Sequence, residues 1–203
     1  MIVYKYMKIE HVKDSIKNGI YAAPLNTFND PYECKGIRYL DDYRVCCLTG
    51  SSRQMIMWAY YGNHKGCCVS FEIPDKLEIV KEINYTKEYY NHTKMSNEEL
   101  VDILYTKAYE WNHEKEIRIV YNSEDSDKSL WNYDNDKVYF KGKVREVNFG
   151  LNVDFKEKNC QELLKYLSMN EEYYHIIVNQ CRLSDSRYEI VKDKQFNYKK
   201  EII

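Results

Sequence analysis

The sequence predicts an α+β protein, a single domain over residues 1–203 with a largely antiparallel or mixed sheet and short helices. Short apolar runs typical of strands outnumber the segments with helical spacing. These runs do not alternate regularly with helices, as they do in proteins built from β-α-β units. The length of 203 residues and the hydrophobic content of 44% are sufficient for one domain with a buried core.

In the first half of the chain, apolar runs predict strands, and Pro24 to Cys34 reads as a loop. Ile9, Val12 and Ile16 have helical spacing, which predicts a helix over residues 10–18 that ends at Gly19. A second helix is expected over residues 54–61, before Gly62. The expected strands cover residues 2–6, 20–23, 43–48, 66–73 and 79–85.

In the second half, Ser96 and Glu99 form a capping box that predicts a helix ending near Trp111. Residues 122–136 are polar and predict an exposed loop. Asn159 with Glu162 predicts the start of a helix that continues through residue 169. Further strands are expected from Glu116 onward and over residues 138–140, 144–149, 176–183 and 188–191.

Composition limits the function. The net charge of −2 and the pI of about 6.2 argue against tight binding of duplex nucleic acid. No apolar run approaches the roughly 20 residues of a membrane-spanning helix, so no membrane partner is expected. Seven cysteines without a Cys-x-x-Cys pair indicate reduced thiols in a cytoplasmic protein. His64 and Cys67 are too few to bind zinc, and we expect no metal.

Residues 111–118, Trp-Asn-His-Glu-Lys-Glu-Ile-Arg, are the most informative stretch. On a strand, Glu116 and Arg118 share one face, as does Glu114 if the strand begins that early, while Ile117 and Ile119 take the other. Two carboxylates beside a guanidinium suit a site for a charged ligand. From this segment alone, a solvated salt-bridge ladder on an exposed face is the simpler interpretation.

Two loops carry further hypotheses. His64, Lys65 and Gly66 follow an expected helix and predict a turn that contacts an anion beside a pocket. Asn29, Asp30 and Pro31 are expected to fix a loop rather than perform chemistry, because Asn and Asp cap backbone groups and Pro rigidifies the chain. The 21 tyrosines offer stacking surfaces for a base or nicotinamide, although an AT-rich coding sequence also explains them.

Several segments together resemble the bacterial and phage family catalogued as domain of unknown function 2971, over residues 3 to about 150. Residues 151–203 would then be a strand-helix-strand elaboration. Ile117 stands where that family often has Trp, and Tyr32 where Phe is usual. The resembling segments are Val3-Tyr4-Lys5-Tyr6, Phe28-Asn29-Asp30-Pro31-Tyr32-Glu33, Cys46-Cys47-Leu48-Thr49, residues 57–66 (Met-Trp-Ala-Tyr-Tyr-Gly-Asn-His-Lys-Gly) and Glu114-Lys115-Glu116-Ile117-Arg118.

The chain also resembles ADP-ribosyltransferases, which place an Arg, His or Tyr on a first strand, a Ser, Thr or Tyr on a middle strand and a Glu, often Glu-x-Glu, on a late strand. This resemblance implies NAD as a substrate, with Glu116 acting on the ribose and Glu114 on the acceptor. It implies transfer of ADP-ribose to a protein or nucleic-acid acceptor, in conflict between bacteria and phages. The implied NAD-binding residues are Tyr4, Lys5, Tyr6, Thr49, Ser51, Tyr60, Tyr61, His64, Lys65 and Arg118.

The alternative hypothesis is a binding module without catalysis. Trp58, Tyr60 and Tyr61 would then form an aromatic patch for a nucleotide or a protein partner. Under this interpretation Glu116 and Arg118 are structural. A flat, exposed position of Glu116 would favour the binding module, and a position at a cleft would favour the enzyme.

Overall fold

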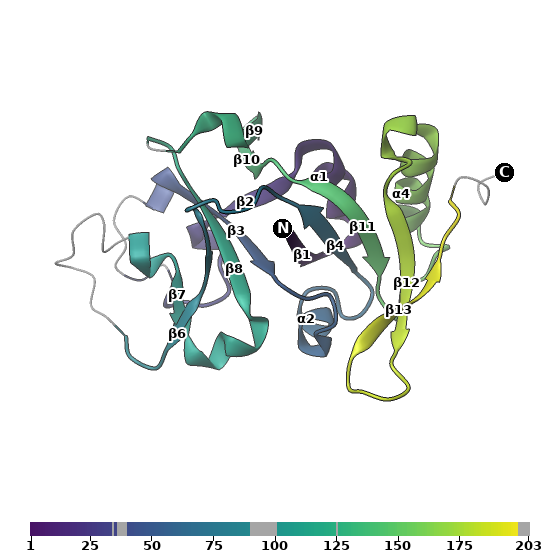
Figure 1. Cartoon of the computed structure of the whole chain (residues 1–203), viewed down its shortest axis with the longest axis horizontal. Helices are drawn as coiled ribbons and strands as arrows, with labels where there is room; N and C mark the ends of the chain where they lie inside the picture. Colours follow the sequence, from purple (N-terminus) through teal and green to yellow (C-terminus); the bar gives the residue numbers. More distant parts are fainter. Residues whose placement is uncertain (34, 36–39, 90–100, 125, 199–203) are drawn as a thin grey trace. The chain divides into compact units, whose positions relative to one another are not determined.

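The computed structural model describes residues 1–33, 35, 40–89, 101–124 and 126–198 (Figure 1). Within them the α+β prediction is confirmed, because short helices accompany strands that pair mostly antiparallel. The chain divides into two compact units. Unit 1 comprises residues 1–19, 50–73 and 142–203, and unit 2 comprises residues 20–49 and 74–141. The single domain over residues 1–203 stays a prediction.

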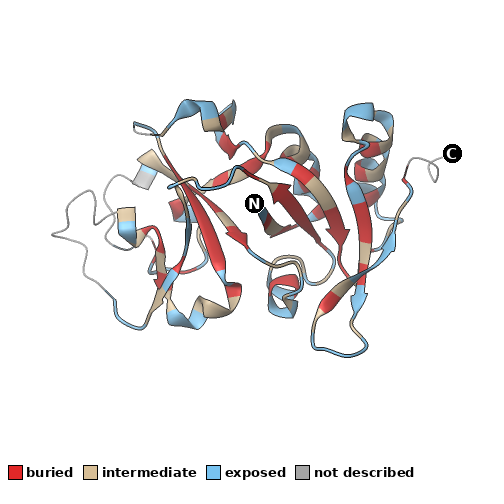
Figure 2. Ribbon diagram, viewed as in Figure 1, coloured by how far each residue is buried: buried red, intermediate tan, exposed pale blue. Residues whose placement is uncertain are grey.

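Unit 1 contains a mixed sheet in the order β13-β12-β11-β4-β1, in which β11 and β12 are parallel and the other neighbours antiparallel. The central strand β4 is buried along almost its whole length (Figure 2). The elements are β1 (Ile2–Met7), η1 (Ile9–His11), α1 (Val12–Asn18), α2 (Met55–Tyr60), β4 (Cys67–Glu72), β11 (Lys143–Phe149), α4 (Lys158–Met169), η7 (Glu171–Tyr173), β12 (Ile177–Leu183) and β13 (Ile190–Gln195).

The two faces of the unit 1 sheet are covered by different helices. Tyr6 and Met7 are neighbours on β1 and therefore point to opposite faces. Tyr6 packs with Trp58 of α2, and the hydroxyl of Ser15 on α1 lies 3.7 Å from the sulfur of Met7. The helix α4 packs against η1 and α1, with Cys160, Leu163 and Leu167 as its buried stripe.

Unit 2 contains a sheet in the order β9-β10-β2-β3-β8-β5, all antiparallel, and a separate parallel pair of β6 and β7. The elements are β2 (Ile20–Pro24), η2 (Leu25–Thr27), η3 (Leu40–Asp42), β3 (Tyr43–Thr49), β5 (Val80–Glu82), β6 (Asn84–Thr86), β7 (Thr106–Ala108), η5 (Tyr109–Glu114), β8 (Glu116–Asn122), η6 (Lys128–Leu130), β9 (Trp131–Asp134) and β10 (Lys137–Phe140).

The strand β8 organises the core of unit 2. It lies between β3 and β5, and its residues 116–121 are all buried. Val120 packs in a cluster with Leu25, Val45, Leu104 and Tyr105. Because alternate residues share a face, Arg118 and Glu116 point to the same side as Val120. The strand therefore carries a charged pair into the interior of the unit.

Most strand predictions are confirmed, but three expectations differ from the structure. The helix expected to run to Trp111 stops early: residues 101–103 are helical, and the chain then forms β7 and η5, while Ser96 and Glu99 lie outside the described residues. The expected strand over residues 79–85 is two strands, β5 and β6, in different sheets. The expected loop over 122–136 contains η6 and β9, because Trp131 is buried and Asn135, at φ 52°, turns the chain into β10.

Candidate functional site

Five ionisable side chains of unit 2 lie together in its interior and are called the charged cluster here. All are buried, and Arg118 is only 1% exposed. The simpler interpretation of an exposed salt-bridge ladder is therefore wrong, and Glu116 does not lie on a flat exposed face. The members are Glu33, Lys107, Glu114, Glu116 and Arg118.

Four elements deliver these side chains. Glu116 and Arg118 come from one face of β8, as the sequence predicts. Glu114 does not belong to that strand; it ends the 3-10 helix η5, and Lys115 follows in the left-handed conformation with φ 44°. This left-handed residue lets the chain change direction, so that Glu114 and Glu116 both reach Lys107. Lys107 comes from β7, and Glu33 from the loop before β3.

Arg118 is held at every nitrogen of its guanidinium group. Its Nε donates to Glu116 Oε1 at 2.8 Å, and its Nη2 donates to Glu116 Oε2 at 3.1 Å, which is the paired geometry that arginine prefers with carboxylates. Nη2 also donates to Glu33 Oε1. Nη1 donates to the carbonyl oxygen of Leu104 at 2.8 Å, and the guanidinium lies 5.3 Å from the ring centre of Phe28. These contacts together fix the orientation of the guanidinium group.

Lys107 joins the three carboxylates. Its Nζ lies 2.6 Å from Glu114 Oε2, 3.0 Å from Glu116 Oε2 and 3.7 Å from Glu33 Oε2. The first two are hydrogen bonds, whereas the third is longer than one. The ammonium also lies over the ring of Trp111, 4.9 Å from its centre. Lys107 therefore binds Glu114 and Glu116 firmly and Glu33 loosely.

The two carboxylates that share Arg118 have pKa values shifted in opposite directions. Burial pushes the pKa of Glu116 upward, but the Arg118 guanidinium and the Lys107 ammonium outweigh it and hold this pKa at about 2. Burial raises the pKa of Glu33 above its usual value, although Arg118 and Lys107 act against the rise. Carboxylates with pKa values pushed apart are typical of acid-base pairs in enzymes. Glu116 thus keeps its charge, and Glu33 can exchange a proton more readily.

A pocket of about 420 Å³ opens beside the cluster and is called the unit 2 pocket. Glu33 and Lys107 belong to both the cluster and the pocket lining. Tyr32 and Tyr89 line it with ring centres 5.4 Å apart. Its volume lies in the range of small-molecule sites. The remaining lining residues are Asp30, Thr86, Lys87, Glu88, Ile103, Thr106, Ala108 and Glu110.

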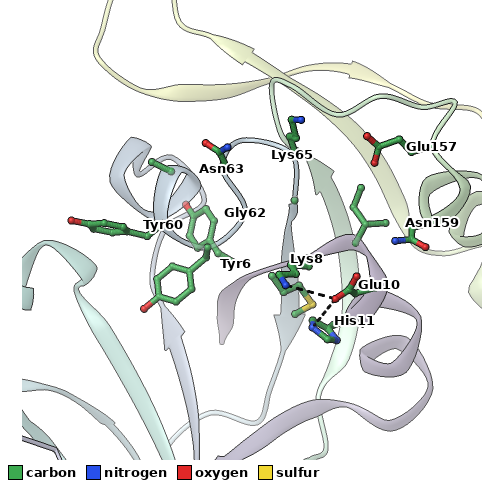
Figure 3. Close-up of a pocket in the computed structure, with 15 residues that line it drawn as sticks. Tyr6, Lys8, Glu10, His11, Tyr60, Gly62, Asn63, Lys65, Glu157 and Asn159 are labelled. Atoms are coloured by element: carbon green, nitrogen blue, oxygen red, sulfur yellow. Dashed lines mark ion pairs between the residues drawn. The ribbon is translucent and has the colours of Figure 1, made fainter. Parts of the chain in front are cut away.

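Unit 1 has a pocket of its own, of about 640 Å³, called the unit 1 pocket (Figure 3). Tyr60 projects beside it and is 65% exposed. Lys65 and Gly66 line this pocket, so the turn formed by residues 64–66 lies beside a pocket as predicted. Its contact with an anion stays a prediction. On one wall, Glu10 pairs with Lys8 and His11. The predicted NAD-binding residues in this lining are Tyr6, Tyr60, Tyr61 and Lys65.

Tyr6 also has a structural role in unit 1. Its hydroxyl donates to the carbonyl oxygen of Ser51 at 3.0 Å and accepts from the backbone N–H of Gln54 at 3.3 Å. Burial raises the pKa of this hydroxyl well above its usual value, so the group stays neutral. Trp58 is 1% exposed, lies edge-on to Tyr6 and donates its indole N–H to Ser52. Trp58 therefore belongs to the core rather than to an accessible aromatic patch.

The other predicted site residues are placed as follows. Thr49 is buried and lies opposite Glu116 in the antiparallel pairing of β3 with β8. Tyr4 is half-buried and packs beside the core of unit 1. Lys5 and His64 are also half-buried, and neither lines the unit 1 pocket. The structure thus brings Glu114, Glu116 and Arg118 together in unit 2, and Tyr6, Tyr60, Tyr61 and Lys65 together in unit 1.

Sequence reasoning did not select Lys107 or Glu33 as site residues. Glu33 stands in the resembling segment that begins at Phe28, which was a usable signal. Lys107 gave none, because it fell inside an expected helix. Within the described parts of the chain, no three His, Cys, Asp or Glu side chains are arranged to hold a metal ion, and no helix is long and apolar enough to cross a bilayer.

No family model matches the chain, and neither the curated proteins nor the solved structures include a match. The resemblances to the domain of unknown function 2971 family and to ADP-ribosyltransferases therefore stay predictions.

Proposed function

We propose that the unit 2 pocket is the active site of an NAD-consuming transferase, which breaks the bond between nicotinamide and ribose and passes ADP-ribose to a protein or nucleic-acid acceptor. One observation carries the proposal. Glu33 lines the pocket with its Oε2 in no direct hydrogen bond within the described structure, while Glu116 stays ionised behind it. The reaction class itself comes from the resemblance to ADP-ribosyltransferases.

The charged cluster is difficult to explain as a stabilising device. Three carboxylates and two cations lose their hydration in the interior, and their mutual attraction often only compensates for that cost. Apolar side chains of similar volume would fill the same space without this desolvation cost. Buried charge clusters that open into a pocket are, by contrast, typical of functional sites.

Glu33, rather than Glu116, is the carboxylate that contacts the ribose in this proposal. Both oxygens of Glu116 already accept hydrogen bonds from Arg118 or Lys107. Glu33 uses Oε1 for Arg118, which leaves Oε2 for a ligand. In the transition state positive charge develops at C1′ of the ribose, and an ionised Glu33 stabilises it. Glu116 then acts as a positioning residue, because it fixes Arg118 and through it Glu33.

The proposal is tested by mass spectrometry of nicotinamide released from NAD, with candidate acceptors, together with a binding titration. Glu33→Gln keeps the shape of the side chain and removes its charge. We expect it to slow release by about a hundredfold or more and to leave NAD binding largely intact. Glu78→Gln removes an exposed carboxylate of unit 2 that does not line the pocket and serves as the matched control, with a near-normal rate. Wild-type protein that neither binds NAD nor releases nicotinamide with any acceptor would overturn the proposal.

A binding module at the unit 1 pocket is the second candidate. The observation that favours it is the position of Tyr60, Tyr61 and Lys65 around one pocket, where aromatic rings and an ammonium suit a base and a phosphate. It would bind a nucleotide without turnover. Tyr60→Ser and Lys65→Gln would then weaken binding of ADP-ribose while Glu33→Gln would not, and no nicotinamide would be released.

A further inference from the structure

Asp30 carries an oxygen that the local structure does not use. Its side chain is 3% exposed and lies on the wall of the unit 2 pocket. Its Oδ1 accepts the backbone N–H of Tyr32 at 2.9 Å, as expected for an Asp that fixes a turn. Its Oδ2 is buried and has no hydrogen-bond partner in the described structure. The loop therefore explains one oxygen of Asp30 and not the other.

The turn at Asp30 requires one uncharged oxygen acceptor, whereas a carboxylate provides two oxygens and a negative charge. An Asn at position 30 offers the same Oδ1 acceptor, and the Asx turn forms equally well with Asn. A buried, unpaired charged oxygen lowers stability, since it loses its water without gaining a donor. Asp30 thus lowers the stability of the protein without ligand, and it lies on the wall of a pocket. A ligand that donates a hydrogen bond to Oδ2 would explain why this position carries a carboxylate.

The surroundings of Asp30 indicate what kind of donor this is. The pocket lining contains four carboxylates and two ammonium groups. One of the two ammonium groups, that of Lys107, already binds Glu114 and Glu116. The wall thus offers acceptors and negative charge, which favour a ligand group with N–H donors and positive charge over a phosphate. Tyr32 and Tyr89 add aromatic contact for a ring.

We propose that Asp30 determines specificity by accepting, through Oδ2, a hydrogen bond from the carboxamide N–H of the nicotinamide ring. This inference rests on the proposed function and names the part of NAD that enters the pocket. The ring of NAD is a cationic pyridinium, which suits the acidic wall, and its carboxamide supplies the donor that Asp30 lacks. A carboxylate at the same position on the ring is repelled.

Ligand analogues test the proposal on wild-type protein without mutation. Binding is measured by calorimetry for NAD, for its 3-acetylpyridine analogue, which lacks the N–H donor, and for nicotinic acid adenine dinucleotide, which carries a carboxylate. We expect both analogues to bind at least about tenfold more weakly than NAD, because a site built around a donor rejects ligands without it. Equal affinity for NAD and the 3-acetylpyridine analogue overturns the assignment.

The variant Asp30→Asn tests whether Asp30 causes the preference for NAD over nicotinic acid adenine dinucleotide. The variant keeps the Oδ1 acceptor for Tyr32 and removes the unpaired charged oxygen, so it should unfold at the wild-type temperature or above it. We expect the discrimination between NAD and the acidic dinucleotide to fall to within about threefold. Glu78→Gln, which removes an exposed carboxylate of unit 2 outside the pocket lining, is the control and should keep the discrimination. NAD binding and turnover with unchanged discrimination in Asp30→Asn overturn this inference alone, whereas absence of NAD binding to the wild type overturns the proposed function as well.

Discussion

The two units bury polar groups in different ways. In unit 1, the Tyr6 hydroxyl and the Trp58 indole N–H bond to backbone groups of the segment that leads into α2. All of these partners are neutral. In unit 2, the interior holds Arg118, Lys107 and three carboxylates, and one further carboxylate oxygen, on Asp30, has no partner in the described structure.

The difference indicates which buried polar groups serve the fold. Neutral groups bonded to nearby backbone fix the position of α2 at small cost, because each bond contributes modestly and nothing charged is desolvated. The charged cluster carries a large desolvation cost and opens into a pocket. We therefore interpret the Tyr6–Trp58 pair as scaffold and the charged cluster as the chemical site.

The largest expected effect is the removal of Arg118. Arg118→Met leaves Glu33 and Glu116 buried with Lys107 as the one remaining cation of the cluster, which should lower the free energy of unfolding by about 3–5 kcal/mol. The control is Arg145→Met in unit 1, which breaks a half-exposed pair with Glu72 and should cost less than about 1 kcal/mol. Denaturant titration measures both. Similar losses in the two variants would contradict the account.

The pH dependence of stability tests the charge state of Glu116. Because its pKa falls from 4.5 to about 2 on folding, its contribution is present above pH 4.5 and is lost as the pH falls toward 2. The shift corresponds to roughly 3 kcal/mol. The raised pKa of Glu33 acts in the opposite direction and offsets part of it. Wild-type protein should therefore lose more stability than Glu116→Gln between pH 4.5 and 2, as followed by urea titration at each pH; parallel curves would be the contrary result.

Tyr6→Phe tests the scaffold role in unit 1. The change removes one donated and one accepted hydrogen bond and keeps the ring against Trp58. We expect a loss of about 1–2 kcal/mol in unfolding free energy, with unchanged NAD binding. Tyr188→Phe is the control, because Tyr188 is 97% exposed and should show no change. A loss of NAD binding in folded Tyr6→Phe would move the site toward unit 1.

The smallest effect on stability is expected for the turn at Asp30. Asp30→Ala removes the acceptor for the Tyr32 N–H and should lower the unfolding free energy by about 1 kcal/mol, the usual scale for a lost cap. Relief of the unpaired Oδ2 offsets part of this loss. Thermal denaturation measures the change. An Asp30→Ala protein less stable than Arg118→Met would show that the turn, and not the cluster, is the sensitive part of unit 2.

The periodicity of the sequence was sufficient to place β8 and to put Glu116 and Arg118 on one face. It could not show that this face is buried, because the groups that cover it come from distant parts of the chain: Glu33 lies 85 residues before Arg118. Lys107 was missed because Leu104 and Ala108 have the spacing of a helix, and the sequence therefore predicted a helix around it. In the structure Leu104 lies in a turn and Ala108 in β7. Local patterns thus predicted the strand, and only tertiary structure revealed the cluster and its pocket.

Hydrogen exchange in the presence of NAD tests the comparison between the two units most directly. Amide exchange is measured by mass spectrometry for wild-type protein with and without NAD, and for Glu33→Gln as a variant expected to bind without turnover. We predict slower exchange with NAD in peptides that cover residues 30–33 and 106–110, because these segments supply seven residues of the unit 2 pocket lining. Protection confined to peptides that cover residues 59–63 and 65–66 of the unit 1 pocket, or no protection anywhere, would contradict the claim that the charged cluster of unit 2 is the chemical site.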